Sequence, residues 1–492
     1  MRDHDEVVKN IMRKTEQYEK QAAERKARRK IVIPSVLLAV AACLLGVIVW
    51  KFAGNNIKDP KNNGTVTVTQ APVTQTPVSQ TPASPTDKPQ EEPTPTTAPD
   101  PKGESKNLTE SVSSSSKVNT KEMDDKMRTA YETFAYKLFS ALPEEGTRMV
   151  SPFSVYMALG MLANGADGNT LAQMDELLGL TAEERNAYLA AWVERLTSGD
   201  EDATKFTNAD SIWIRDAYET LVPRTFLDVC ANYYKAAVYS TPMNDSTVFD
   251  INNWVKKNTM NMIDRLIDEL SPDAVMFLMN AIALDAKWEE EFSEARTQKD
   301  YTFTKEDGTT AKVDMMFTNM KRWYLENDLM TGFMKQYKGG EFSYIAMLPK
   351  EGVSLSQLVN SLKPGDVSEA IMNRESGDIL IGVPKYTEEY SANLNEVLQK
   401  LGMTDVFNRD KSNLTRLLNT EGPTYVSRVI HKTYIGVDEK GTKAAAVTGI
   451  EVVEESVSMP YTVILDRPFV YMIVDSEGLP IFLGTYEGPT GQ

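Results

Sequence analysis

The chain contains very little of two residue types on which much protein chemistry depends. Its 492 residues include two cysteines, Cys43 and Cys230, and two histidines, His4 and His431. One pair of cysteines makes no disulfide framework, so stability must come from packing. With neither a CxxC nor an HExxH pattern, no metal site and no cofactor are expected. A Ser-His-Asp hydrolase would have to use His431 without a GxSxG sequence, so we expect a protein that is not an enzyme.

Positive charge is scarce outside the N-terminal region. The net charge is -17, and residues 1–55 hold 11 Lys and Arg against 6 Asp and Glu, which leaves -22 for the rest of the chain. An acidic body disfavours binding to nucleic acid. The basic run ERKARRK at residues 24–30 therefore indicates membrane topology rather than a nucleic-acid patch.

A long run without charge follows these basic residues. Ile31–Trp50 is 20 residues long, and at about 1.5 Å per residue it would span a hydrocarbon core of about 30 Å. The positive-inside rule then leaves residues 1–30 as a cytoplasmic tail and places the rest outside. We expect a single-pass cell-membrane protein with an extracellular head. A cleaved signal peptide and lipidation at Cys43, in VAAC, are the alternatives.

Residues 51–121 are rich in Thr, Pro, Ser and Gln. Such a composition does not bury enough apolar area to fold, and its prolines favour extended conformations. The sequence predicts a disordered stalk over this range and a folded domain over residues 122–492. In that domain, helical and strand patterns are mixed without a regular βαβ rhythm, which indicates an α+β fold.

One short segment near the C-terminus has an unusual pattern. In residues 442–453, alternate side chains fall on two faces of an extended strand. One face is uncharged, and the other carries Lys443 and Glu451; the uncharged residues are Thr442, Ala444, Ala446, Thr448, Ile450 and Val452. The pattern fits a half-buried strand. Ala and Gly are poor strand formers, so an Ala-rich helical turn or a poor edge strand remains the alternative.

Six segments of the folded domain, taken in order, resemble the serpin family. They are SPFSVYMALGMLANGADGNT, NAIALDAKW, MLPKEG, VPKYTEEYSANLNEVLQKLGMTDVF, VIHKTYIGVDEKGTKAAAVTG and DRPFVYMI. The resemblance implies three β-sheets with surrounding helices and an exposed reactive loop. It also implies a monomeric inhibitor of serine proteases: the protease cleaves the loop, the freed segment inserts into the central sheet, and the protease stays trapped as an acyl ester.

The same resemblance implies roles for individual residues, which fall into three groups. The hinge of the loop comprises Glu439, Gly441, Thr442, Ala444, Ala445 and Ala446; the shutter beneath the central sheet comprises Ser151, Ser154, Asn280 and His431; and the breach at its top contains Trp288. A histidine on a strand and a lone tryptophan are equally compatible with simple core positions. Lys443 departs from the family, which commonly has Glu there, but it lies on the outward face.

The reactive bond follows from counting the family's seventeen residues from Glu439. The count places it between Glu455 and Ser456, which favours a glutamyl-specific protease. The segment before the RPF sequence is about two residues longer than in some members. A bond after Val452 or Val453 would instead point to an elastase-like protease. The alternative function is a non-inhibitory binding module with the serpin fold, tethered to the membrane.

Overall fold

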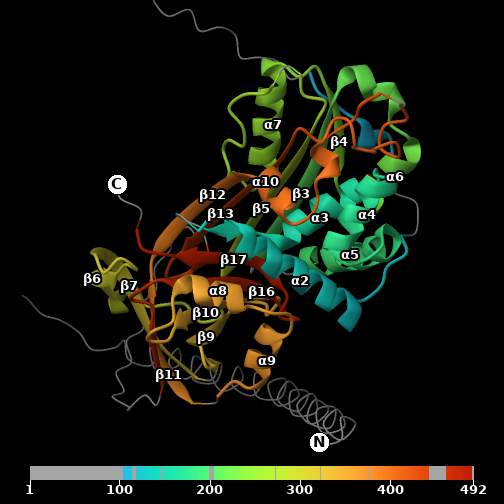
Figure 1. The fold of residues 1–492 in the computed structure, drawn as a ribbon. Helices are drawn as coiled ribbons and strands as arrows, with labels where there is room; N and C mark the ends of the chain where they lie inside the picture. Colours follow the sequence, from blue (N-terminus) through green and yellow to red (C-terminus); the bar gives the residue numbers. More distant parts are fainter. Residues whose placement is uncertain are drawn as a thin grey trace, which may run out of the picture. The chain divides into compact units, whose positions relative to one another are not determined.

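Three β-sheets and a set of helices form the folded body, as predicted (Figure 1). The structure, a computed structural model, describes residues 104–442 and 461–489, with gaps at 113–117, 145, 147, 199–203, 272, 322, 376 and 421. The described residues all belong to one compact unit of the chain, Thr96–Gln492.

The sheets have seven, six and four strands. The central sheet has the order β1 (Lys106–Asn107), β4 (Ala237–Thr241), β3 (Thr204–Arg215), β5 (Met276–Lys287), β14 (Gly441–Thr442), β13 (Arg428–Val437) and β12 (Tyr386–Asn393). The six-stranded sheet has the order β2 (Met149–Val150), β17 (Pro480–Tyr486), β16 (Phe469–Asp475), β10 (Phe342–Pro349), β9 (Met330–Gln336) and β8 (Tyr324–Glu326). The four-stranded sheet has the order β15 (Tyr461–Ile464), β11 (Asp378–Pro384), β7 (Thr310–Lys321) and β6 (Thr297–Thr304).

The helices lie around these sheets. They are α2 (Asp125–Ala141), α3 (Pro152–Ala163), α4 (Gly168–Leu178), α5 (Ala182–Thr197), α6 (Arg224–Tyr233), α7 (Asp245–Asn258), α8 (Leu355–Ser361), α9 (Asp366–Met372) and α10 (Asn395–Lys400). Helix α3 begins with residues that favour a helix start: Pro152 occupies its first turn, and the Ser151 hydroxyl accepts a hydrogen bond from the backbone N–H of Ser154. All twelve residues of α3 are buried, so it is a core helix.

The alternation of side chains along β5 divides the core in two. Leu278, Ile282 and Leu284 pack in the large cluster that includes α3, whereas Phe277 and Met279 pack in a smaller cluster with α7. Because successive side chains of a strand point to opposite faces, α3 and α7 cover opposite faces of the central sheet (Figure 1). The smaller cluster also contains Ile430 of β13.

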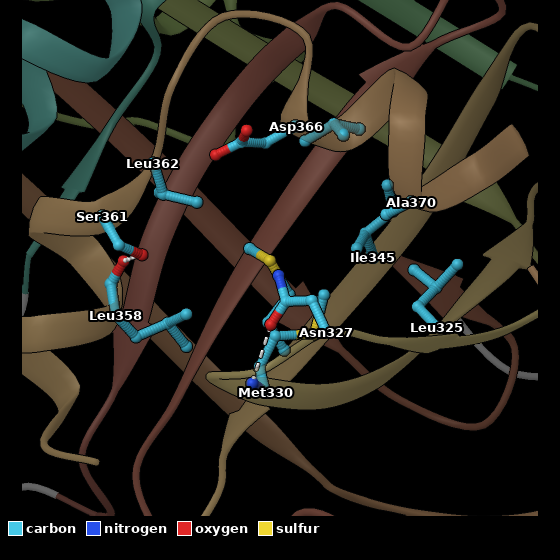
Figure 2. A pocket seen from close by; sticks show the side chains of 11 residues that line it. Leu325, Asn327, Met330, Ile345, Leu358, Ser361, Leu362, Asp366 and Ala370 are labelled. Atoms are coloured by element: carbon cyan, nitrogen blue, oxygen red, sulfur yellow. Dashed lines mark hydrogen bonds between the residues drawn. The ribbon is translucent and has the colours of Figure 1, made fainter. Parts of the chain in front are cut away.

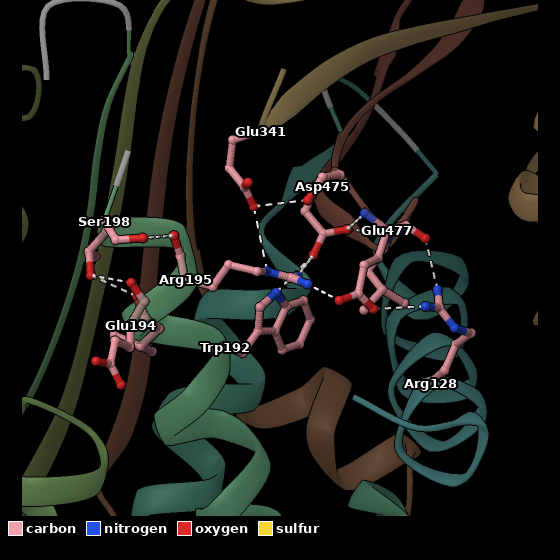
Figure 3. A network of polar contacts seen from close by, with 12 residues as sticks. Arg128, Trp192, Glu194, Arg195, Ser198, Glu341, Asp475 and Glu477 are labelled. Atoms are coloured by element: carbon pink, nitrogen blue, oxygen red, sulfur yellow. Dashed lines mark hydrogen bonds and ion pairs between the residues drawn. The ribbon is translucent and has the colours of Figure 1, made fainter. Parts of the chain in front are cut away.

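A network of charged groups fixes the end of α5 to the six-stranded sheet (Figure 3). The guanidinium of Arg195 pairs with the carboxylates of Asp475 and Glu477 and lies 3.5 Å from that of Glu341. Arg128 on α2 pairs with Glu477 at 2.8 Å. Several elements distant in the sequence are therefore held together at this end of α5, just before the chain enters β3.

The folded body begins upstream of residue 121, the end of the stalk expected from composition. Strand β1 pairs antiparallel with β4, and the short 3-10 helix η1 (Leu108–Ser111) follows it. The backbone N–H groups of Glu104 and Ser105 donate to one carboxylate oxygen of Asp250 on α7. We call residues 104–112 the N-terminal strap. It covers an edge strand whose unpaired groups would otherwise be open to other chains.

The predicted cell-membrane localisation is corrected. Among the described residues, no helix is both long and apolar enough to cross a membrane. The fully buried helix α3, for example, would extend only about 18 Å at 1.5 Å per residue. We therefore withdraw the single-pass membrane localisation with an extracellular head. The cytoplasmic tail at residues 1–30, the segment Ile31–Trp50 and the stalk up to residue 103 lie outside the described residues.

Candidate functional site

The hinge segment turns back into the central sheet immediately after β13. Asp438 closes this turn by accepting hydrogen bonds from the backbone N–H groups of Lys440 and Gly441. Strand β14 then lies between β5 and β13, with Thr442 opposite Ala286. Only glycine fits at position 441, because a Cβ atom there would lie 2.0 Å from the carbonyl oxygen of Ala286. The loop therefore starts as a strand within the sheet.

Glu439 anchors the turn from the side. Its carboxylate accepts a 2.8 Å hydrogen bond from the hydroxyl of Thr297 and pairs with the Lys385 ammonium at 2.7 Å. Burial by itself would raise the pKa of Glu439, but the bonds from Lys385 and Thr297 outweigh it and hold the pKa below its usual value. The carboxylate is thus ionised at neutral pH. Sequence reasoning did not find Lys385, which lies more than fifty residues earlier in the chain.

Trp288, the residue that follows β5, contacts the same turn. Its backbone N–H donates to the carbonyl of Lys440 and its indole N–H to the carbonyl of Asp438. Its ring stacks on Tyr337, with centroids 4.4 Å apart. The Tyr337 hydroxyl is hydrogen-bonded to that of Thr442, which is only 2% exposed. The residue predicted at the breach therefore lies against the hinge, and Tyr337 is a further contact that the sequence did not indicate.

Below β14, strands β5 and β13 still pair directly. Their parallel register runs from Phe277 opposite Arg428 to Ile282 opposite Thr433. We call these paired residues the seam. Any extension of β14 must separate the seam, because the new strand would take the place between β5 and β13.

The four predicted shutter residues meet at the seam, where Asn280 is the register partner of His431. The Asn280 side-chain amide donates to the carbonyl and the hydroxyl of Ser154. His431 Nε2 accepts the backbone N–H of Ser151 at 3.1 Å, so the ring proton is on Nδ1, which donates to the Asn280 side-chain oxygen at 2.6 Å. Burial lowers the pKa of His431 to about 3, so the imidazole is neutral.

Asp210 on β3 also belongs to this network, although sequence reasoning did not single it out. Its carboxylate accepts hydrogen bonds from the side-chain amides of Asn280 at 2.6 Å and Asn208 at 2.7 Å. Burial raises the pKa of Asp210 to about 7, against the lowering effect of these two bonds. The strand pattern NADSIWI places Asp210 on a strand, but it does not reveal which side chains surround it.

Three hinge alanines and the predicted reactive bond are not part of this description. Ala444, Ala445, Ala446, Glu455 and Ser456 lie outside the described residues. Their roles stay predictions. No group of three or more metal-ligating side chains occurs in the part of the chain that the structure describes.

The chain is similar to known proteins over most of its folded body. A family model described as serpin (serine protease inhibitor) matches residues 129–489. The chain belongs to the serpin family. It is 30% identical to intracellular coagulation inhibitor 2 of Tachypleus tridentatus over 387 residues, which cover 73% of this chain and 90% of that protein. As members of the family are inhibitors of serine proteases rather than catalysts, the expectation that the chain is not an enzyme is consistent with this result.

Two solved structures have folds similar to that of this chain. The thermophilic serpin tengpin in its native state is 36% identical, with a TM-score of 0.73, and the match covers 78% of this chain and all of tengpin. Thyroxine-binding globulin in complex with thyroxine has a TM-score of 0.67 over 74% of this chain and all of that protein, but only 23% identity. The second likeness therefore shows the fold alone.

A cavity between α8, α9 and the six-stranded sheet bears on the alternative function as a binding module (Figure 2). Apolar side chains line most of it, among them Leu325, Ile345 and Leu358. Its volume is about 20 Å³, which is room for about one water molecule. Sites for drug-sized ligands measure roughly 300–1,000 Å³. This cavity does not favour a ligand-binding function.

Proposed function

We propose that the chain is an inhibitory serpin that traps serine proteases by inserting its cleaved loop into the seam. The observation that carries the proposal is the position of Thr442, the first residue of the uncharged face, already buried between β5 and β13. The small, uncharged residues that follow on the same face support it, because a charge there would cost several kcal/mol on burial.

The register of β14 supports this assignment of inward-facing loop residues, independently of the composition. If β14 grows without a shift, each later residue meets the residue one earlier on β5, so Ala446 would meet Ile282 and Thr448 would meet Asn280. These positions of β5 face the large core cluster and the shutter. Val452 would meet Met276, the first residue of β5. The sheet thus has places for the loop up to Val452, and a cut after that residue would free a segment long enough to fill all of them.

For the target, we propose a glutamyl-specific protease that cuts between Glu455 and Ser456. An elastase-like protease that cuts after Val452 or Val453 is the alternative, and a cut at either position would also free a segment that fills the places along β5. The non-inhibitory binding module remains the second candidate function. The cavity in Figure 2 is too small for a drug-sized ligand, so a binding site would have to lie elsewhere.

The test is to incubate the chain with a panel of serine proteases and run a denaturing gel. We expect a covalent complex that resists SDS with a glutamyl-specific protease and none with a trypsin-like one, which finds no Lys or Arg between Lys443 and Arg467. Mass spectrometry of the released peptide identifies the bond. Glu455→Arg should redirect trapping to trypsin-like proteases. If every protease that cuts the loop leaves only cleaved chain, the binding module is the better description.

A further inference from the structure

Asp210 is a buried charge without a positive partner. Its side chain is 3% exposed, and its hydrogen-bond partners are the two neutral amides of Asn208 and Asn280. Among the described residues, no cation forms an ion pair with it. Removal of a carboxylate from water is costly unless a cation compensates, so the closed sheet holds the ionised form of Asp210 at a free-energy cost.

The neighbouring elements do not supply the missing charge. On β13 the nearest titratable group is His431, which is neutral and reaches Asp210 only through Asn280. Helix α3 offers Tyr156, whose hydroxyl donates to the carbonyl of Leu178. Other titratable groups line the cavity described next, and none of them adds an electrostatic contribution at Asp210: Glu110, Lys235, Tyr239, Asp250 and Lys257.

Two features around Asp210 would allow its carboxyl group to gain and lose a proton. An open cavity of about 480 Å³ between β3, α7 and the N-terminal strap has Asn208 and Asp210 in its lining, so solvent lies close to this part of β3 although the Asp210 carboxylate itself is buried. The side-chain oxygen of Asn208 is buried and accepts no hydrogen bond. It lies on the same amide that donates to Asp210, and a flip of that amide about its χ2 bond would offer this acceptor to a protonated Asp210.

We propose that Asp210 is a proton-responsive positioning residue of the seam: its carboxylate orients Asn280 toward His431, and its ionisation favours opening of the sheet because opening would hydrate a charge that the closed sheet desolvates. The protonated carboxyl would favour the closed sheet. This goes beyond the family's reaction, and its link to loop insertion rests on the proposed function.

The direction of the pH effect follows from the raised pKa. Between the ordinary value of about 4 and about 7, the native protein binds one more proton at Asp210 than the unfolded chain does. The stability that this group contributes is therefore greatest at low pH and falls as the pH rises through this window. Above about pH 7 both states are ionised, and the destabilisation is complete.

Asp210→Asn tests the proposal, because asparagine is a neutral, isosteric stand-in for the protonated acid. The stability of the variant relative to wild type, measured by denaturant unfolding at a series of pH values, cancels the titration of every other group. We expect the folding constant of the variant, divided by that of wild type, to rise about tenfold per pH unit from about pH 4 toward pH 7 and then to level. A ratio that does not change with pH overturns the proposal.

Asp405→Asn is the matched control. Asp405 is also a buried carboxyl, at 7% exposure, but the hydrogen bond from Asn169 holds its pKa below the usual value. Its ratio to wild type should stay constant from pH 5 to pH 8. If Asp210→Asn does not fold, carbon-13 NMR of the labelled aspartates follows the wild-type carboxyl directly, and Asn208→Ala should move its titration upward. No aspartate titrating above pH 5 would contradict the proposal.

The link to insertion is tested separately, by the rate of protease trapping. The ratio of the variant rate to the wild-type rate at each pH cancels the protease's own pH dependence. For Asp210→Asn we expect a ratio near one at pH 5 and well below one at pH 8. A pH-independent ratio with trapping intact contradicts this inference alone, whereas the expected unfolding profile without any trapping contradicts the proposed function alone.

Discussion

Asp210 and Asp475 are both buried carboxyl groups, and burial raises the pKa of each, but their partners differ. Asp475 pairs with the Arg195 guanidinium and accepts a 2.9 Å hydrogen bond from the indole N–H of Trp192 (Figure 3). Asp210 has only the neutral amides of Asn208 and Asn280. The buried carboxylate of Asp475 is therefore paired with a cation. The buried carboxylate of Asp210 at the seam has no such counter-charge.

This difference matches what each region has to do. The end of α5 and the turn after β16 are joined by several ion pairs at once, so a movement there would leave a buried carboxylate without its cation. The seam must part for a strand to enter. The hydrogen bond across the seam between Asn280 and His431 joins two neutral groups, and such bonds are weaker than charge-assisted ones. These two residues therefore have no ion pair to break when β5 and β13 separate.

The largest expected effect comes from placing an unpaired charge at the top of the seam. Thr442→Arg should abolish protease trapping and turn the chain into a substrate, because a guanidinium in the place of the buried Thr442 opposes insertion by several kcal/mol. A denaturing gel would show cleaved chain in place of the covalent complex. Lys443→Arg is the matched control, since it carries the same guanidinium on the outward face and should still trap. Trapping by Thr442→Arg would contradict the assignment of Thr442 to the face of the loop that is buried on insertion.

The next effect tests the paired region. Arg195→Ala should lower the free energy of unfolding by about 3 kcal/mol, because it leaves Asp475 buried without its cation. Urea unfolding measures the loss. Arg224→Ala removes an exposed pair with Asp228 at 2.9 Å and should cost about 0.5 kcal/mol or less. If the two variants lose the same stability, burial of Asp475 is not what makes the network matter.

The effect that is smallest near neutral pH concerns His431, because it develops only in acid. Because burial lowers its pKa to about 3, the unfolded chain binds a proton below about pH 6.5 that the native protein does not bind. This group's contribution to stability is complete above that pH and is lost as the pH falls toward 3, by up to about 1.4 kcal/mol per unit. His431→Gln should reduce this acid slope in denaturant unfolding. An unchanged slope would assign the acid sensitivity to other groups.

His431 and Asp210 therefore act in opposite directions over part of the acid range. Between about pH 4 and 6.5, loss of the His431 contribution with falling pH is offset by the gain from Asp210. The wild-type profile should look flatter than either group alone would make it. Asp210→Asn removes the offset, so its own unfolding profile should become steeper in acid than that of the wild type.

Much of the fold and part of the site followed from local patterns. The entry of α3 at Ser151 and Pro152 depends on capping, which is a property of neighbouring residues. The shutter residues and Trp288 came from the family resemblance, and the structure brings them to the seam and the hinge. Tyr337, Lys385 and Asp210 were missed, because each acts through a contact between distant strands and none stands in a local motif.

The start of the body was also missed. Residues 104–112 have the polar composition of the segment before them, yet Leu108 is 9% exposed and β1 extends the central sheet. Composition predicts whether a segment folds alone. It does not predict whether a segment docks on a surface that the rest of the chain provides, here the open edge of β4 and the carboxylate of Asp250.

The sequence alone determined the family and the uncharged alternation from Thr442 to Val452, since side-chain order along a strand is local. The tertiary structure decided how far the loop already enters the sheet, which pairs form the seam and why Asp210 differs from Asp475. Those properties depend on desolvation and on the nearest counter-charge. Both are set by residues far apart in the chain that only the folded sheet brings together.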